Sequence, residues 1–379
     1  MMKPIYLDYN ATTPHDPEVI AAMRPYLEEH FGNPSSSHSY GMKAREAVET
    51  ARSQVALLLG CMPGEVIFTS GGTESNNHAI RGIAAVYGKK GGRIITTQIE
   101  HPAVTEVCKF LEIYGFRTTY LPVDEYGLVN PADVEKAINP ETVLITIMHA
   151  NNEVGTIQPI EGISEIARRK GILLHTDAAQ SAGKMPVNVD VLGVDLLSIA
   201  GHKLYAPKGI GVLYVRGDVQ LAKFMHGAGQ ESGKRAGTEN VIEIVGLGKA
   251  CEIAARDIEK TGLHMIAMRD RLFDGLRHQL KNIRLNGHPE KRLPNTLNVG
   301  IRGIKADLLL SAIQEFVAAS AGAACHSGGT TISSVLRAMN VPEEWALGTL
   351  RLTTGKMTTV DEIDEAVAVI SKAALRLKA

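Results

Sequence analysis

The amino-acid sequence predicts an α/β fold in which a large, mostly parallel sheet is joined by a smaller α+β domain. Short apolar runs alternate with helical patterns through the first two thirds of the chain, and this alternation is typical of a parallel sheet with helices on both faces. After about residue 258 the alternation ends and a long amphipathic pattern begins. The 379 residues, 44% of them hydrophobic, are enough for a large core in one or two domains.

Short apolar runs mark the expected strands of the large sheet. They occupy residues 66–68, 93–96, 118–123, 143–148, 172–175, 195–199 and 209–215. The last run follows its predecessor too closely for a helical crossover, so we expect it to be antiparallel. Between residues 42 and 59, apolar residues at helical spacing predict a helix that Gly60 and Pro63 end.

The change of pattern predicts two domains. Residues 13–258 form the expected large domain, and residues 1–12 and 259–379 form the expected small one. Apolar residues between 265 and 280 recur at helical spacing, and a second amphipathic helix is expected near residues 360–376. Because the first dozen residues precede the first strand–helix unit, we expect them to join the small domain.

Composition narrows the range of partners. The formal net charge is -1, so no electrostatic argument favours a nucleic-acid or membrane partner. No stretch has the length of a signal peptide or a membrane span, and cysteines 61, 108, 251 and 325 have no zinc-ligand spacing. We therefore expect a cytoplasmic protein in a reduced compartment, with no metal site.

Lys203 lies where one expected strand leaves the sheet, in the segment SIAGHKLYAPKG of residues 198–209. Ligands of α/β proteins bind in the crevice at the carboxyl ends of such strands. A lysine held there can lose its proton by desolvation and attack a carbonyl. The alternative is a solvated lysine at a strand end.

Two further segments fit an anionic, heterocyclic ligand. The turn Ser70-Gly71-Gly72-Thr73 joins a strand to a helix, and such a turn presents N–H groups to a phosphate. Asp177 follows another strand, where its carboxylate can pair with a protonated ring nitrogen. Together with Lys203, these features are what pyridoxal 5'-phosphate requires. The alternative for residues 70–73 is an ordinary glycine-rich turn, and the alternative for Asp177 is the N-cap of a helix.

Three other side chains are candidates for chemistry. His101 follows the expected strand 93–96 and suits stacking on a ring or moving protons; its alternative is a structural histidine. Cys325 lies among small residues in a segment expected to be mobile and partly exposed, and an exposed thiol is a usable nucleophile. The alternative is an inert thiol, which is the commoner case for free cysteines. Arg351 suits bidentate binding of a carboxylate, and its alternative is a surface salt bridge.

These residues stand in motifs that resemble the cysteine desulfurases of the NifS/IscS branch, within the class V aminotransferase-like enzymes. The similarity runs in register over essentially the whole chain. The motifs are YLDYNATTP (6–14), GNPSS (32–36), TSGGTESNN (69–77), EH (100–101), NNEVG (151–155), DAAQ (177–180), GHK (201–203), RAGT (235–238) and Arg351.

The resemblance implies fold type I, with a seven-stranded sheet, and a homodimer. It makes Lys203 the lysine bonded to pyridoxal phosphate, Asp177 the partner of the ring nitrogen and Gln180 a hydrogen-bonding partner of the ring hydroxyl. His101 stacks on the ring and shuttles protons. The phosphate is held by Gly72, Thr73 and His202, with Thr238 contributed by the partner subunit.

The resemblance also implies the reaction. L-cysteine, its carboxylate held by Asn152 and Arg351, is converted to L-alanine. Cys325 accepts the sulfur as a persulfide and passes it to an acceptor protein. That acceptor is an iron–sulfur scaffold, a tRNA-thiolation protein or a DNA-thiolation protein, and the sequence leaves this choice open.

Three departures from the family pattern leave other functions possible for this protein. Ala200 stands where many relatives have a phosphate-binding serine, the segment GAACHS (322–327) resembles the cysteine loop of selenocysteine lyases, and the sequence ends at Ala379 without a scaffold-docking extension. The alternatives are a selenocysteine lyase, a class V aminotransferase and a catalytically silent scaffold dimer. An NAD dehydrogenase is disfavoured because the dinucleotide fingerprint is missing.

Overall fold

The large sheet is mixed, with one reversed strand among parallel ones. A computed structural model describes residues 3–88, 91–321, 323–326 and 329–378, and for residues 323–326 and 329–331 the backbone alone. Within these ranges the sheet has seven strands in the order β2-β8-β7-β6-β5-β3-β4. Their bounds are β2 Val66–Thr69, β3 Arg93–Thr97, β4 Arg117–Leu121, β5 Thr142–Thr146, β6 Leu173–Asp177, β7 Leu196–Ala200 and β8 Gly211–Val215. Strand β8 is antiparallel to both β2 and β7, as expected.

Helices cover both faces of this sheet because neighbouring apolar residues on each strand point to opposite sides. Ile94 and Leu144 pack with helices α3 and α4, whereas Ile95 and Ile145 pack in the cluster that includes α2 and α6. The helices of this part are α1 Pro17–Glu28, α2 Ser39–Leu59, α3 Gly72–Tyr87, α4 Pro102–Glu112, α5 Pro131–Ala137, α6 Ile160–Lys170 and α7 Val189–Leu192. Helix α2 ends where expected, at Gly60, whose φ of 67° is left-handed.

The second part of the fold contains a four-stranded antiparallel sheet of order β12-β15-β10-β9. The N-terminal strand β1 lies beside β11, and Ile5 and Leu7 pack in the apolar cluster of this part. The elements here are β1 Ile5–Tyr6, β9 Ile283–Leu285, β10 Thr296–Ile301, β11 Val317–Ala318, β12 Ser320–Ala321, β15 Thr349–Thr353, α9 Ala306–Ile313, α10 Ser334–Ala338, α11 Glu343–Ala346 and α12 Val360–Lys378. A hairpin, β13 Ala323–His326 with β14 Gly329–Ile332, carries the backbone of Cys325.

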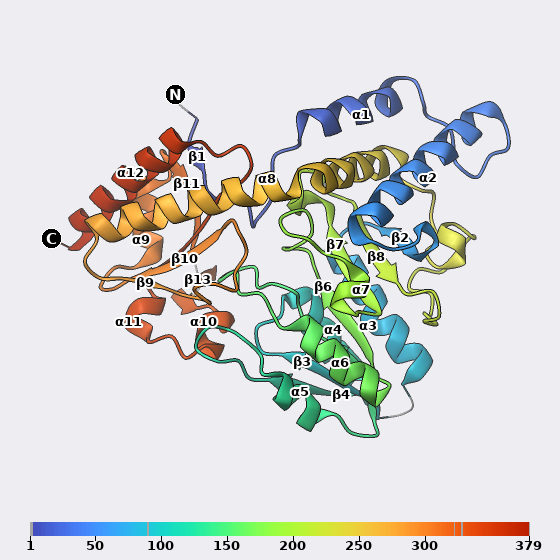
Figure 1. Ribbon diagram of the computed structural model, residues 1–379, viewed down its shortest axis with the longest axis horizontal. Coiled ribbons are helices and arrows are strands. Elements are labelled where there is room, and N and C mark those ends of the chain that lie inside the picture. The colour runs from blue at the N-terminus through green and yellow to red at the C-terminus, as the bar shows by residue number, and fades with distance from the viewer. Residues whose placement is uncertain (1–2, 89–90, 322, 327–328, 379) are drawn as a thin grey trace.

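Helix α8, Val241–Gln279, joins the two parts as one continuous element of 39 residues, and Figure 1 shows it running from α2 to α12. The apolar pattern predicted only its second half. The first half packs on α2 through small residues: a Cβ on Gly248 would lie 2.6 Å from the Cα of Ala51. The first half also buries large apolar residues at helical spacing, Val241, Ile244 and Leu247, which the sequence analysis missed. The expected domain boundary at residues 258 and 259 falls inside α8 and stays a prediction.

Among the described residues, none of the helices combines the length and the hydropathy needed to cross a membrane.

Candidate active site

Nearly all the predicted site residues line one cavity of about 280 Å³ at the carboxyl edge of the large sheet. They are Gly72, Thr73, His101, Asn152, Asp177, Gln180, His202, Lys203 and Arg351. Thr238 instead lies exposed in the loop before α8. The backbone of Cys325 pairs with Thr330 in the β13–β14 hairpin, and the side chain of Cys325 lies outside the described part of the chain.

The strand order explains why these segments meet. Asp177 pairs with Ser198 in parallel register, so the ends of β6 and β7 lie side by side. Gly211 of β8 pairs with Ala200 on one side and Thr69 on the other. A Cβ on Gly211 would lie 2.6 Å from the Cα of Gly71, so glycine is required there. The turn that opens α3 is therefore held against the end of β7.

Lys203 ends the 3₁₀ turn Gly201–Lys203 that follows β7. Its Nζ donates a hydrogen bond to the carbonyl oxygen of Ala11 at 2.8 Å and another to that of Asn10. Burial lowers the pKa of Lys203 to about 8, the positive charge of Arg351 adds to the effect, and Asp8 and Asp177 oppose it. The lowered pKa increases the fraction of Lys203 that is a neutral amine at neutral pH, and this is the form that attacks a carbonyl.

Asp177 is held as a carboxylate acceptor at the end of β6. Its Oδ1 accepts a hydrogen bond from the Ala179 backbone N–H at 2.9 Å, and its Oδ2 accepts one from Asn76 Nδ2 at 2.7 Å. Asp177 is only 8% exposed. The next helix among the described residues begins at Val189, so Asp177 is not an N-cap. Its fixed orientation suits pairing with a cationic ring nitrogen.

The turn that the sequence predicts to hold a phosphate lies at the N-terminus of α3. Gly71 is the N-cap and makes no side-chain capping bond, and the first N–H groups of any α-helix have no partner within the helix. A Cβ on Gly72 would lie 3.3 Å from the Cβ of Ala200. The turn therefore needs small residues at both positions to approach β7 this closely.

Two histidines with lowered pKa values line the cavity. His101 is the N-cap of α4, and its Nδ1 accepts a hydrogen bond from Ala103 N at 3.1 Å. His101 is exposed and lines the cavity. The protein atoms around its ring still exclude part of the water, and this desolvation lowers the pKa of His101. The positive charge of Lys203 lowers this pKa further, and the negative charge of Asp177 opposes the shift. Burial lowers the pKa of His202 to about 4. Both rings are neutral at neutral pH.

Arg351 of β15 is already paired inside the protein. Its Nη2 lies 2.8 Å from Asp8 Oδ1, and its Nη1 donates to the carbonyl oxygen of Asn152 at 3.3 Å. Both charged side chains of this pair are mostly buried, so the alternative of a surface salt bridge does not apply. Asp8 also accepts a hydrogen bond from Ser320 Oγ at 2.9 Å, which ties the pair to the strand before Cys325.

Sequence reasoning missed four residues around the cavity: Asp8, Asn10, Asn76 and Lys184. Asn10 and Asn76 line it, and Asp8 and Lys184 bond to residues that do. Periodicity gives no signal for Asp8, Asn10 and Asn76, because each bonds to partners distant in sequence. Lys184 bonds to Gln180, four residues away, and to the distant Asn10. Asp8, Asn10 and Asn76 do belong to two of the family motifs.

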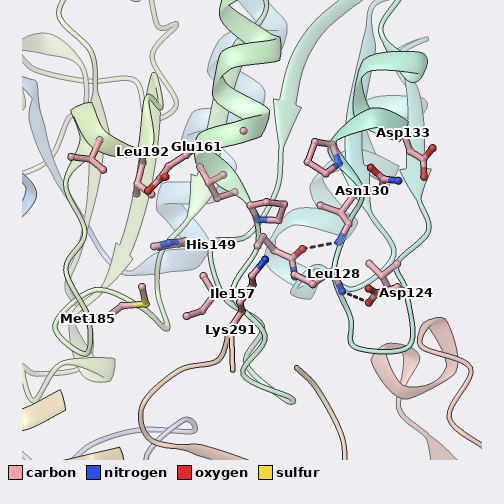
Figure 2. Close-up of a pocket in the computed structure, with 18 of the residues that line it drawn as sticks. Asp124, Leu128, Asn130, Asp133, His149, Ile157, Glu161, Met185, Leu192 and Lys291 are labelled. Carbon is pink, nitrogen blue, oxygen red and sulfur yellow. Dashed lines mark hydrogen bonds between the residues drawn. The ribbon is translucent and has the colours of Figure 1, made fainter. Parts of the chain in front are cut away.

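A larger cavity of about 1080 Å³ contains none of the predicted site residues. Figure 2 shows it between the segment holding Asp124 and Leu128 and the segment holding Met185 and Leu192. Its walls are mainly apolar, and His149 contributes a ring whose Nδ1 lies 2.9 Å from Ser181 Oγ. Size alone would select this cavity, whereas the lysine, carboxylate and helix N-terminus together select the smaller one.

The fold and this arrangement place the chain in a known class of enzymes. The family model for aminotransferase class V matches residues 5–366, and the chain belongs to that family. Among curated proteins it is 47% identical to the cysteine desulfurase IscS of Dictyoglomus turgidum, over 100% of this chain and 96% of that relative. It is also 47% identical to the cysteine desulfurase IscS of Methanosarcina thermophila, over 99% of this chain and 93% of that one.

Solved structures give the same picture. A NifS-like protein is 38% identical and superposes with a TM-score of 0.92 over 98% of this chain and 99% of its own. The structure of SspA in complex with cysteine is 39% identical, with a TM-score of 0.83 over 93% of this chain and 99% of its own. The fold is therefore that of the NifS-like enzymes, as predicted.

Proposed function

We propose that this protein is a pyridoxal-phosphate-dependent cysteine desulfurase, which converts L-cysteine to L-alanine and transfers the sulfur through Cys325. One observation carries the proposal: a half-buried lysine of lowered pKa shares a cavity with a fixed carboxylate and a helix N-terminus. The names of the relatives, and the cysteine bound in one of the similar structures, support the choice of substrate.

Membership of the class V family implies pyridoxal phosphate as cofactor, and the residues of the cavity fit it. Lys203 would bond to its aldehyde carbon, Asp177 would pair with its ring nitrogen, and the α3 N-terminus at Gly72 and Thr73 would hold its phosphate. His202 and Gln180 would contact the phosphate and the ring hydroxyl. Bound pyridoxal phosphate withdraws electrons from the carbons of an attached amino acid.

The chain's own residues then orient cysteine and move its protons. Arg351 and Asn152 bind the substrate carboxylate, and Lys203, once free, removes the proton from the substrate Cα. Asp177, whose carboxylate is oriented by the hydrogen bond from Asn76, would favour the protonated ring nitrogen through its negative charge. His101 shuttles a proton at Nε2, since its Nδ1 accepts the Ala103 N–H.

Sulfur leaves the substrate by attack of the Cys325 thiolate. A sulfur–sulfur bond forms, the Cβ–sulfur bond of the substrate breaks, and the electron pair stays with the carbon that becomes the methyl group of alanine. An ordinary thiol is only a few per cent ionised at neutral pH. We infer that proton transfer through His101 increases the thiolate fraction.

Assembly and location complete the proposal. Thr238, exposed in the single chain, would reach the phosphate of the partner subunit in a homodimer, and closed twofold symmetry is the commonest arrangement. The sulfur acceptor is an iron–sulfur scaffold or a tRNA- or DNA-thiolation protein, and the protein acts in the cytoplasm. We also propose that residues 13–258 form the large domain and residues 1–12 with 259–379 the small one.

A selenocysteine lyase is the second candidate, favoured by Ala200 and by the sequence around Cys325. Sulfur leaves less readily than selenium, so it should need the attacking thiolate more. The test measures alanine formed from cysteine and from selenocysteine, with thiol present, for the native protein and Cys325→Ala. A desulfurase should lose cysteine turnover in the variant and retain some activity on selenocysteine. Native protein active on selenocysteine alone would support the lyase.

The lysine assignment has its own test. Lys203→Ala should abolish the visible absorbance of bound cofactor and the borohydride-reducible lysine adduct, while Cys325→Ala keeps both. Cysteine turnover by Cys325→Ala equal to that of the native protein would eliminate Cys325 as the nucleophile. Pyruvate and an aminated product would instead indicate an aminotransferase.

A further inference from the structure

Lys184 is a buried lysine whose hydrogen-bond partners are side-chain amides. It is 3% exposed, and among the described residues no carboxylate oxygen forms an ion pair with its Nζ. Its Nζ bonds instead to two side-chain amides, Gln180 Oε1 at 2.9 Å and Asn10 Oδ1 at 3.0 Å. Lysines are almost never buried this deeply without a paired charge, so the position requires a specific explanation.

The N–H groups of Lys184 face the oxygen atom of each amide. As an ammonium group Lys184 can only donate hydrogen bonds, and in the structure its Nζ donates to the carbonyl oxygens of Gln180 and Asn10. The NH₂ group of Gln180 consequently faces away, and its Nε2 donates to the Asn10 backbone oxygen at 3.0 Å. Burial, together with the charges of Lys203 and Arg351, lowers the pKa of Lys184 well below its usual value, and a neutral amine still has N–H bonds for both oxygens.

Asn10 extends this arrangement to the rest of the site. It is 1% exposed, and its Oδ1 also accepts a hydrogen bond from Asn295 Nδ2 at 3.0 Å. Its Nδ2 donates to the carbonyl oxygen of Asn152 and to Thr296 Oγ1. Its backbone oxygen accepts from both Gln180 Nε2 and Lys203 Nζ. Lys184 is therefore linked through one residue to the lysine of the cavity.

We propose that Lys184 is a positioning residue that locks the Gln180 amide with its NH₂ group toward the cofactor cavity. This inference rests on the proposed function, in which Gln180 donates to the ring hydroxyl oxygen. With Lys184 in place, one Nε2 proton binds Asn10 and the other remains for that oxygen. If the amide turned over, a carbonyl oxygen would face the ring oxygen and repel it.

The central test replaces Lys184 with methionine, which matches the unbranched stem of lysine up to Cε and lacks the amine with its N–H donors. Lys184→Met should weaken binding of pyridoxal phosphate about tenfold and shift the pH midpoint of the bound cofactor's visible absorbance. Gln180→Ala should do the same. Because Lys184 acts through Gln180, the double variant should be no worse than either single one; additive losses would overturn the proposal.

A second variant keeps the test valid if Lys184→Met fails to fold. Gln180→Glu retains an oxygen for Lys184 but places the other oxygen toward the cavity, as a turned amide would. It should weaken cofactor binding at least as much as Lys184→Met, and cofactor binding equal to native would overturn the proposal. Lys170→Met, at an exposed position at the end of α6, is the matched control and should change neither readout.

The outcomes separate this inference from the proposed function. If Lys184→Met binds cofactor with native affinity and spectrum while Lys203→Ala loses the absorbance, the positioning role is wrong and the proposed function stands. If Lys203→Ala also keeps the absorbance, the proposed function fails first. Urea unfolding is measured in parallel, and a changed stability with an unchanged spectrum would likewise overturn the positioning role.

Discussion

The lowered pKa of Lys203 predicts how the cofactor-free protein captures an aldehyde. With a pKa of about 8, about one Lys203 in ten carries a neutral amine at neutral pH, against about three in ten thousand at the ordinary value of 10.5. Only the neutral amine attacks a carbonyl. The rate of capture of pyridoxal phosphate should therefore rise with pH, reach half its maximum near pH 8 and then level off.

Two neighbouring charges should move this midpoint in opposite directions. The positive charge of Arg351 lowers the pKa of Lys203, and the negative charge of Asp8 raises it. Arg351→Gln should therefore move the midpoint to higher pH, and Asp8→Asn should move it to lower pH. Below the midpoint the neutral fraction falls about tenfold for each pH unit, so the effect on rate at neutral pH is readily measured.

The assay is stopped-flow absorbance after mixing cofactor-free protein with pyridoxal phosphate across the range from about pH 6 to about pH 10. A simple lysine derivative, treated identically, corrects for titration of the cofactor itself. A native midpoint indistinguishable from that of the lysine derivative would refute the role of burial. A shift of both variants in the same direction would refute the charge argument.

Three further substitutions test packing and buried charge, each by urea unfolding. Glu231→Gln should lower the free energy of unfolding by about 3–5 kcal/mol, because the buried Glu231 carboxylate accepts two 2.8 Å bonds from Arg52. Gly355→Ala should cost about 1–3 kcal/mol, since the new Cβ would lie 2.1 Å from the Tyr9 ring. Burial raises the pKa of Glu100 to about 8, so the folded protein keeps a proton that the unfolded chain releases above its ordinary pKa of 4.5. Stability should fall as pH rises between these values, and Glu100→Gln should remove that slope.

Each of these three stability predictions has an outcome that would contradict it. Glu344→Gln breaks the exposed pair with Arg302 and should change stability by less than about 1 kcal/mol; an equally small effect of Glu231→Gln would contradict the buried-pair argument. Native stability in Gly355→Ala would mean that Tyr9 moves aside freely. An unchanged pH slope in Glu100→Gln would assign the slope to another group.

The sequence by itself determined the large sheet and the chemical residue types of the site. Apolar runs alternating with helical patterns can bury both faces of a strand only in a covered, mostly parallel sheet, and the structure has that sheet. Lys203, Asp177 and the turn at Gly72 each follow a strand, and the carboxyl ends of parallel strands meet at one edge. Local pattern therefore predicted the place as well as the residues.

Only the tertiary structure decided how the site is held together. Asp8 and Asn10 act on partners that lie far away in sequence: Asp8 on Arg351, and Asn10 on Gln180, Lys184 and Lys203. Such contacts leave no periodic signal, because hydrogen-bonding geometry depends on which strands become neighbours. The first half of α8 is a different case, because it buries large apolar residues at helical spacing, Val241, Ile244 and Leu247. That pattern was present in the sequence, and the structure shows that it continues without a break into the predicted second half of the helix.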